Sequence, residues 1–181
     1  MNGRELVIGV TGGIAAYKTA ALVSRLVQSG AGVTIVTTEA GQRFVGSATF
    51  AALTGRPVCR EVFDDVQYPG AAHIKLAEKA DLLCVAPATA NFLAKAAHGI
   101  ADDLLSTLYL SFTGPVLVAP AMNTEMWKKP SVQRNVSQLE QDGVHFIGPA
   151  EGWLACRTKG PGRMSDPEEI FAAIENHLQS V

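Results

Sequence analysis

The fold is decided by residues 6–37, LVIGVTGGIAAYKTAALVSRLVQSGAGVTIVT, in which two apolar runs flank a glycine turn and a helical stretch. The runs 6–10 and 33–37 are rich in Val and Ile, which predicts two strands. Alanines and leucines fill the stretch 15–28 between them, and this composition predicts a helix that Gly30 ends. Together these elements predict a β-α-β unit, whose two strands are parallel.

The rest of the chain continues the alternation of strand and helix. Further strands are predicted at 81–86, 116–119 and 144–147, the last as an inner strand, and further helices at 44–53, 71–80, 91–98, 102–110, 130–141 and from 167 onward. A loop is predicted at 64–70. The alternation predicts an α/β fold with a doubly wound, mostly parallel sheet covered by helices on both faces, a three-layer architecture of the flavodoxin or Rossmann-like kind. We expect residues 1–181 to form a single domain.

Composition narrows the class of protein. Hydrophobic residues make up 48% of the chain and charged residues 18%, which is typical of a compact soluble protein. The net charge of −2 gives no reason to expect nucleic acid or an anionic membrane as a partner. The three cysteines form no C-x-x-C motif and no signal peptide precedes them, so we expect reduced thiols in a cytoplasmic protein.

The glycine turn at residues 11–13 suits a phosphate group. It directs unpaired helix amides to one point, where the helix dipole favours an anion. The dinucleotide motif GxGxxG requires a different glycine spacing, although Glu39 lies near the place of its acidic residue. A P-loop is a near miss, because Lys18 and Thr19 are present but Tyr17 replaces the second glycine. A mononucleotide such as FMN is the third ligand to consider, and a tight turn without any ligand is the fourth interpretation.

Loops of small and polar residues follow several of the predicted strands. They are residues 11–13, 37–39, 87–91 and 120–123. Pro120 has no N–H to donate, so it ends the strand 116–119, and Asn123 lies just beyond. Because the carboxyl ends of parallel strands meet at one edge of the sheet, these loops predict a ligand site at that edge.

Five motifs carry a resemblance to a known family. They are GGIAAYK at 12–18, His73, PATAN at 87–91, PAMN at 120–123 and LAC at 154–156. In this order, and over nearly the whole chain, they resemble the homo-oligomeric flavin-containing cysteine decarboxylases. The resemblance is greatest to members that decarboxylate 4′-phosphopantothenoylcysteine to 4′-phosphopantetheine in coenzyme A biosynthesis. One residue departs from the family, which usually has glycine where this chain has Arg157.

The resemblance implies a bound FMN and a set of site residues. The implied FMN-binding residues are Gly12, Gly13, Ile14, Thr37, Thr38, Phe44, Pro87, Ala88, Thr89, Ala90 and Ala121. The implied catalytic residues are His73, Asn123 and Cys156, and the implied substrate-binding residues are Asn123, Ala155 and Met164. We expect no metal site, because the other histidines lack the spacing of metal ligands.

The implied chemistry needs a proton acceptor, a carboxylate holder and a proton donor. Oxidation of the substrate cysteine to a thioaldehyde allows CO2 to leave, and reduction of the resulting enethiol restores the flavin. His73, in the first turn of a predicted helix, suits the acceptor, because a helix N-terminus favours neutral imidazole. Asn123 suits the holder, since an amide orients a carboxylate without stabilising its charge as arginine would. Cys156 suits the donor, with nearby Arg157, Lys159 and Arg163 expected to lower its pKa.

The basic residues Lys18, Lys159 and Arg163 are candidates either for contact with the substrate phosphate or for a solvated basic surface. The flavin site of the family lies at subunit contacts, so the resemblance implies a homo-oligomer, either a trimer or a dodecamer of trimers. The chain ends before the synthetase domain of many bacterial relatives, which makes a separate phosphopantothenate-cysteine ligase a candidate partner. Two alternatives stay open, a peptidyl-cysteine decarboxylase of a modified-peptide pathway and a non-catalytic flavin-binding regulatory subunit.

Overall fold

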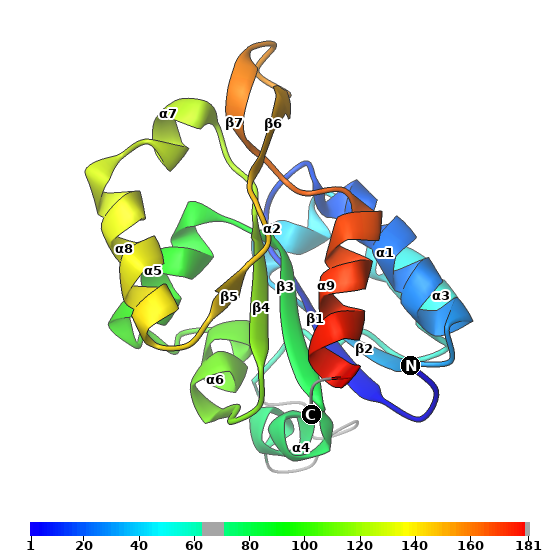
Figure 1. Ribbon diagram of the computed structural model, residues 1–181. Helices are drawn as coiled ribbons and strands as arrows, with labels where there is room; N and C mark the ends of the chain where they lie inside the picture. Colours follow the sequence, from blue (N-terminus) through cyan, green and yellow to red (C-terminus); the bar gives the residue numbers. More distant parts are fainter. Residues whose placement is uncertain (63–70, 180–181) are drawn as a thin grey trace.

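A five-stranded parallel sheet forms the centre of the computed structural model, which describes residues 1–62 and 71–179 (Figure 1). Its strands are β1 Glu5–Val10, β2 Gly32–Thr37, β3 Leu82–Ala88, β4 Val116–Pro120 and β5 His145–Phe146. They lie in the order β2-β1-β3-β4-β5, and each neighbouring pair is parallel. This is the flavodoxin-like order, in which chain direction along the sheet reverses between β1 and β3. The predicted doubly wound fold is therefore confirmed.

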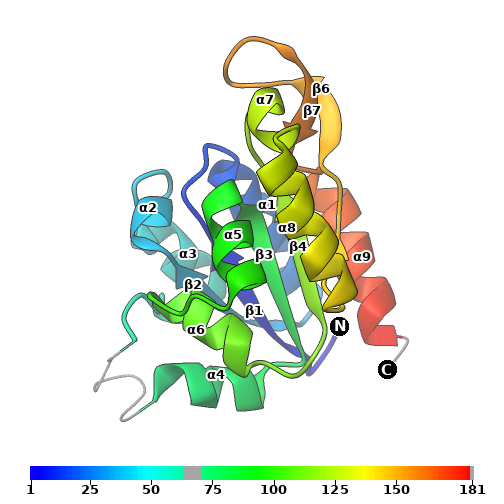
Figure 2. The ribbon, with the colours of Figure 1, turned by 90° about the vertical axis from the view of Figure 1, so that its left-hand side faces the viewer.

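Helices cover both faces of this sheet (Figures 1 and 2). They are α1 Ala16–Gln28, α2 Glu39–Gln42, α3 Ser47–Thr54, α4 Ala72–Lys79, α5 Ala90–His98, α6 Leu104–Ser111, α7 Thr124–Trp127, α8 Pro130–Gln141 and α9 Pro167–Gln179. One face packs against α1, α3 and α9, and the other against α4, α5, α6 and α8. Within the described part of the chain, none of these helices has the length and apolar character needed to cross a membrane.

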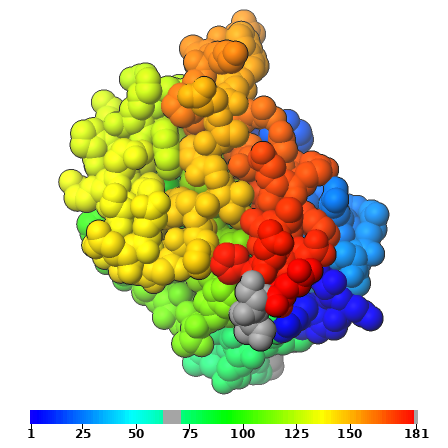
Figure 3. Space-filling view, in the orientation of Figure 1, coloured from blue at the N-terminus to red at the C-terminus, as the bar shows by residue number. Residues whose placement is uncertain are grey.

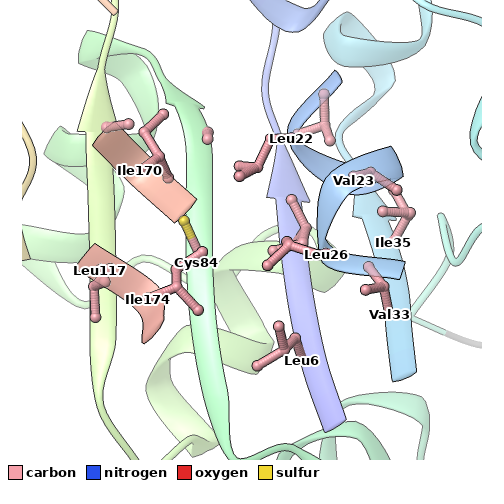
Figure 4. Close-up of a cluster of buried hydrophobic side chains, with 14 of the residues drawn as sticks. Leu6, Leu22, Val23, Leu26, Val33, Ile35, Cys84, Leu117, Ile170 and Ile174 are labelled. Atoms are coloured by element: carbon pink, nitrogen blue, oxygen red, sulfur yellow. The ribbon is translucent and has the colours of Figure 1, made fainter. Parts of the chain in front are cut away.

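Alternating side chains of the strands supply the two halves of the core. Leu6 of β1 belongs to the cluster under α1 and α9, whereas its neighbour Val7 belongs to the cluster under α5 and α6. Figure 4 shows Leu6 and Cys84 of the sheet with Leu26 of α1 and Ile174 of α9. Both faces are thus apolar, as expected for parallel strands that are buried on two sides. The carboxyl ends of the strands are positioned rigidly by this core.

A β-hairpin projects beyond the carboxyl ends of the strands (Figures 1 and 3). It consists of β6 Ala150–Trp153 and β7 Lys159–Arg163, which pair in antiparallel fashion. We call residues 150–163 the flap. The sequence predicts an irregular glycine- and proline-rich loop here, whereas the structure contains a paired ribbon with Cys156 in its turn.

Three sequence predictions require correction. The strand predicted at 144–147 is not an inner strand, because β5 is short, pairs with β4 alone among the described strands and lies at the sheet edge. The helix predicted at 44–53 begins at Ser47, after Gly46 in extended conformation. Pro87 and Ala88 belong to β3 and not to the loop after it. The loop predicted at 64–70 lies outside the described residues.

Candidate active site

A cleft of about 1010 Å³ opens at the carboxyl edge of the sheet. Loops after β1, β2, β3 and β4 line it, and the flap lies along one side. Pockets that bind small molecules have volumes of roughly 300–1,000 Å³, so this cleft has room for a ligand of cofactor size. Among the residues predicted to form the site, the cleft is lined by Gly12, Gly13, Ile14, Thr38, Phe44, Thr89, Ala90, Ala121, Asn123, Ala155, Cys156 and Met164.

The glycine turn lies against the loop that follows β2. A Cβ atom at Gly12 would overlap the side chain of Ala40, and one at Gly41 would lie 2.5 Å from the carbonyl oxygen of Val10. Glycine at these two positions therefore allows the loop after β2 to pack closely against the glycine turn and the end of β1. Gly13 has no such constraint, since a Cβ there would meet its nearest neighbour, Pro87, at 3.7 Å.

The Thr11 hydroxyl links the glycine turn to the loop after β3. It donates to the carbonyl oxygen of Pro87 at 2.6 Å and accepts from the N–H of Thr89 at 3.1 Å. Ala121 after β4 donates its N–H to the carbonyl oxygen of Ala88 at 3.0 Å. Pro87 and Ala88 thus lie behind the cleft wall, and their backbone carbonyls join the three loops together. The sequence motifs gave no signal for this role of Thr11.

The two threonines after β2 differ in position. Thr38 lines the cleft, and its Oγ1 accepts a hydrogen bond from the N–H of Gly41 at 3.1 Å as the N-cap of α2. Thr37 is buried and does not line the cleft directly. Its Oγ1 is buried without a hydrogen-bond partner among the described residues. Buried hydroxyls are nearly always paired, so this unpaired atom is exceptional, and it belongs to the residue directly before the cleft-lining Thr38.

Asn123 presents the donor side of its amide to the cleft. Its Oδ1 accepts from the N–H of Glu125 at 2.8 Å, which makes the residue the N-cap of α7. Because an N–H can pair only with the oxygen of the amide, the NH2 group must face the other way. That group donates to the sulfur of Cys156 at 3.2 Å. The residue is therefore both a structural cap and a fixed donor.

Cys156 is exposed in the turn of the flap. Its sulfur lies 3.0 Å from the hydroxyl oxygen of Thr158, in addition to its contact with Asn123. The hydrogen bond with Thr158 is the main cause that lowers the pKa of the Cys156 thiol, desolvation opposes this, and Asn123 adds to the lowering. The sequence predicted this direction but attributed it to nearby cations, whereas the structure attributes it to hydrogen bonds.

His73 lies far from this cleft within one chain. It belongs to the first turn of α4, at the end of the molecule opposite the flap (Figures 1 and 2). Its side chain does not line the cleft, and its Nδ1 is buried without a hydrogen-bond partner in the described part of the chain. A single chain therefore brings Asn123 and Cys156 together but does not bring His73 to them.

Two of the three basic residues considered for phosphate contact or a solvated surface are engaged in ion pairs. Lys18 lies 2.8 Å from Oδ1 of Asp166, and Arg163 binds the same carboxylate at 2.6 Å and 2.9 Å. The hydrogen bond from Lys18 lowers the pKa of Asp166, desolvation opposes this, and Arg163 adds to the lowering. These contacts connect the base of the flap to α1 and to the start of α9, and they leave Lys18 and Arg163 largely neutralised.

A second charged cluster lines the cleft near α5 and was not predicted. Lys95 binds Asp102 at 2.5 Å and Asp103 at 2.8 Å, and Asp103 also caps α6. Desolvation acts to lower the pKa of Lys95, but the two carboxylates outweigh it and raise the pKa. The sequence signal for this cluster is the Asp-Asp pair before a helix. Among residues 1–62 and 71–179, no group of three or more His, Cys, Asp and Glu side chains is placed to bind a metal ion.

Known proteins resemble this chain over nearly its full length. Residues 1–179 match the family model described as Flavoprotein. The chain is 49% identical over 178 residues to the coenzyme A biosynthesis bifunctional protein CoaBC of Bacillus subtilis, a match that covers 98% of this chain and 44% of that protein. The chain thus spans less than half of the length of this curated relative.

Solved structures resemble it in fold as well as in sequence. The FMN-dependent cysteine decarboxylase SpaF is 38% identical, with a TM-score of 0.86 over 98% of this chain and 97% of that one. A mutant of PPC decarboxylase, complexed with pantothenoylaminoethenethiol, is 28% identical with a TM-score of 0.88 over 97% of this chain and 98% of that one.

Proposed function

The chain belongs to the flavoprotein family, and we propose that it is an FMN-dependent decarboxylase that converts 4′-phosphopantothenoylcysteine to 4′-phosphopantetheine in coenzyme A biosynthesis. The observation that carries this proposal is the contact between the Asn123 amide and the Cys156 thiol at the cleft. One of these groups binds a carboxylate and the other donates a proton. The substrate is supported by the likeness to CoaBC and to the PPC decarboxylase structure.

The cleft suits FMN in size and in chemistry. Its wall at Gly12 packs closely against Ala40, and the Thr37 hydroxyl is buried without a partner among the described residues. When bound, FMN supplies a reversible acceptor for the hydride on the β-carbon of the substrate cysteine. We propose that Gly12, Gly13, Ile14, Thr37, Thr38, Phe44, Pro87, Ala88, Thr89, Ala90 and Ala121 form its site, with Pro87 and Ala88 acting through their backbone.

Asn123 orients the substrate carboxylate in this proposal. Its NH2 group points to the cleft mouth because Glu125 fixes the oxygen on the other side. A neutral donor binds the carboxylate without stabilising its charge as a cation would, and that charge is lost when CO2 leaves. The substrate carboxylate therefore replaces the Cys156 sulfur as the partner of the amide.

Cys156 donates the proton that completes the product. The thiol lies above the same amide, so it faces the carbon from which CO2 has departed. A lowered thiol pKa makes the sulfur a better acid, and its exposed position in the flap turn lets it approach a bound substrate. Ala155 and Met164, which also line the cleft, contact the substrate in this proposal.

We propose that a second copy of the chain supplies His73 as the proton acceptor. Large apolar side chains are exposed both beside the glycine turn and around α4 and α6. They are Ile14, Tyr17, Phe44, Ile74, Ile100 and Leu110, all at least 46% exposed. Exposed apolar groups of this kind are typical of subunit contacts. A trimer, or a dodecamer of trimers, would bring α4 of one copy to the cleft of another.

Coexpression of two inactive variants tests this arrangement. Chains with His73→Asn and chains with Asn123→Asp are each expected to be inactive alone. In a randomly mixed ring, about one quarter of the sites combine a native Asn123 with a native His73 from its neighbour. We therefore expect decarboxylation at about one quarter of the wild-type rate. A mixture as inactive as its parents would contradict a site shared between subunits.

The function itself is tested by mass spectrometry of 4′-phosphopantothenoylcysteine incubated with the flavin-loaded protein without oxygen. We expect stoichiometric loss of CO2 without any external oxidant. A parallel reaction with a peptide ending in cysteine tests the peptidyl-cysteine alternative. The likeness to the cysteine decarboxylase SpaF supports including this test. Turnover of the peptide alone would reassign the substrate, and no CO2 from either compound would favour a regulatory flavoprotein.

The partner enzyme and the cellular compartment can be proposed from the relatives and from the chemistry of Cys156. The CoaBC relatives are bifunctional and more than twice as long as this chain, which supports a phosphopantothenate-cysteine ligase as a working partner. The exposed Cys156 must stay a thiol in order to donate a proton. A reducing compartment preserves such a thiol, so we propose that the enzyme works in the cytoplasm.

A further inference from the structure

The flap turn brings two side chains together that are separated by one residue. The N–H of Leu154 donates to the carbonyl oxygen of Thr158 at 2.9 Å. The N–H of Arg157 donates to the carbonyl oxygen of Leu154, also at 2.9 Å. Arg157 closes the turn with φ of 63°, in the left-handed region. With the chain reversed at this point, the hydroxyl oxygen of Thr158 lies 3.0 Å from the sulfur of Cys156.

The sulfur therefore has two side-chain partners, of which the substrate is proposed to displace one and leave the other in place. The Asn123 amide, at 3.2 Å, belongs to the loop after β4 and is the group that the substrate carboxylate needs. Thr158 belongs to the flap, as the sulfur does, and lies two residues from it in the same turn. When substrate occupies Asn123, the Thr158 hydroxyl is the side chain that still contacts the sulfur.

We propose that Thr158 is a positioning residue, whose hydroxyl orients the Cys156 sulfur toward the cleft and stabilises it after the proton has been given up. The catalytic role of this contact rests on the proposed function. The contact itself is a feature of the structure whatever the function is. In the proton-transfer step, the S–H bond breaks and the proton passes to the α-carbon of the substrate that lost CO2. The sulfur is left with a negative charge, and an O–H donor at 3.0 Å stabilises that charge.

The charged neighbours of the sulfur offer a competing explanation. Arg157 and Lys159 flank the turn in sequence, and Arg163 pairs with Asp166 at the base of the flap. None of the three contacts the sulfur through a hydrogen bond, whereas Thr158 and Asn123 do. The lowered pKa of the thiol is consistent with this, because its main cause is the hydrogen bond from Thr158.

Alkylation of the flavin-loaded protein with iodoacetamide, followed over a range of pH, tests the proposal without any substrate. The reagent reports on Cys156, because Cys59 and Cys84 are buried and burial raises the pKa of Cys84 to about 12. Only the thiolate reacts. In Thr158→Val, which keeps the shape and loses the hydroxyl, we expect alkylation about three- to tenfold slower near neutral pH. The difference should vanish at high pH, where both thiols are ionised.

Two matched variants separate the hydroxyl from shape and from charge. Thr158→Ser keeps the hydroxyl and is expected to react as the wild type does. Lys159→Gln removes a cation from the same turn and is expected to change the rate less than Thr158→Val does. Alkylation of Thr158→Val at the wild-type rate would overturn the proposal, as would an equal slowing in Thr158→Ser or a slowing that is the same at every pH.

A second readout concerns the reaction. With 4′-phosphopantothenoylcysteine, Thr158→Val is expected to release CO2 normally in a single turnover and to regain its oxidised flavin several-fold more slowly than Thr158→Ser. Equal recovery in the two variants would contradict a role for the hydroxyl in proton donation. If the wild type released no CO2, the proposed function would fail, while the alkylation result would still decide whether Thr158 positions the sulfur.

Discussion

An Asn123→Asp variant is expected to lose decarboxylation by at least about a hundredfold while it keeps its flavin and its fold. Aspartate can cap α7 as asparagine does, because its carboxylate also accepts the N–H of Glu125. At the cleft, however, the substitution replaces a donor by an acceptor and adds a negative charge. Two carboxylates at hydrogen-bond distance repel each other, so the substrate carboxylate can no longer occupy this place.

Single-turnover release of CO2 and the flavin absorption spectrum measure these two expectations separately. Asn123→Ser distinguishes charge from loss of the donor, since serine also caps a helix but adds no charge. Gln28→Glu is the control for an amide-to-acid change, because Gln28 lies exposed on α1 and does not line the cleft. An Asn123→Asp variant that decarboxylates near the wild-type rate would remove Asn123 from the site.

The sequence is sufficient to locate this residue for a simple physical reason. A prolyl nitrogen has no hydrogen to donate to a neighbouring strand, which favours the end of a strand, and β4 does end at Pro120, although β3 continues through Pro87 to Ala88. The carboxyl ends of parallel strands share one edge, so polar residues that follow different strands converge. Asn123, Thr89 and the glycine turn were predicted to meet on this basis, and all three line one cleft.

The position of His73 could not be predicted in the same way. The helix that contains it was predicted correctly from local pattern, but the direction of the helix is set by packing. α4 has only eight residues, packs against α6 and lies at the amino end of the sheet (Figures 1 and 2). A helix in the usual crossover position would have pointed its N-terminus toward the cleft edge. In the proposed oligomer, the surface that His73 meets would be set by the arrangement of the copies and not by the local sequence.

The contacts of Cys156 within the flap could not be predicted from the sequence, for a different reason. The partner of the Cys156 sulfur is set by the geometry of a tight turn, and residue spacing alone does not reveal that Thr158 folds back toward it. The resemblance marked Arg157 as a departure, and the structure shows why glycine would suit this position. With φ of 63°, this is the one described non-glycine residue with positive φ, a conformation that costs an L-residue about 1–2 kcal/mol.

A Cys156→Ser variant is expected to release CO2 once and then to retain reduced flavin. Decarboxylation needs the carboxylate holder and the flavin, neither of which the substitution removes. Proton return needs an acid, and a serine hydroxyl is a far weaker acid than a thiol whose pKa is lowered by its hydrogen bond with Thr158. General-acid catalysis contributes about 10²- to 10⁴-fold, so recovery of the oxidised flavin should slow by at least about a hundredfold.

Stopped-flow absorbance under anaerobic conditions follows the flavin directly, and mass spectrometry of the quenched reaction detects the trapped enethiol. Arg157→Gly is the matched control, because it changes the adjacent residue of the same turn to one that adopts positive φ readily and leaves the thiol in place. This control should recover its oxidised flavin as the wild type does. If Cys156→Ser recovers as quickly, the proton comes from another group, and His73 of a neighbouring copy would then be the residue to test.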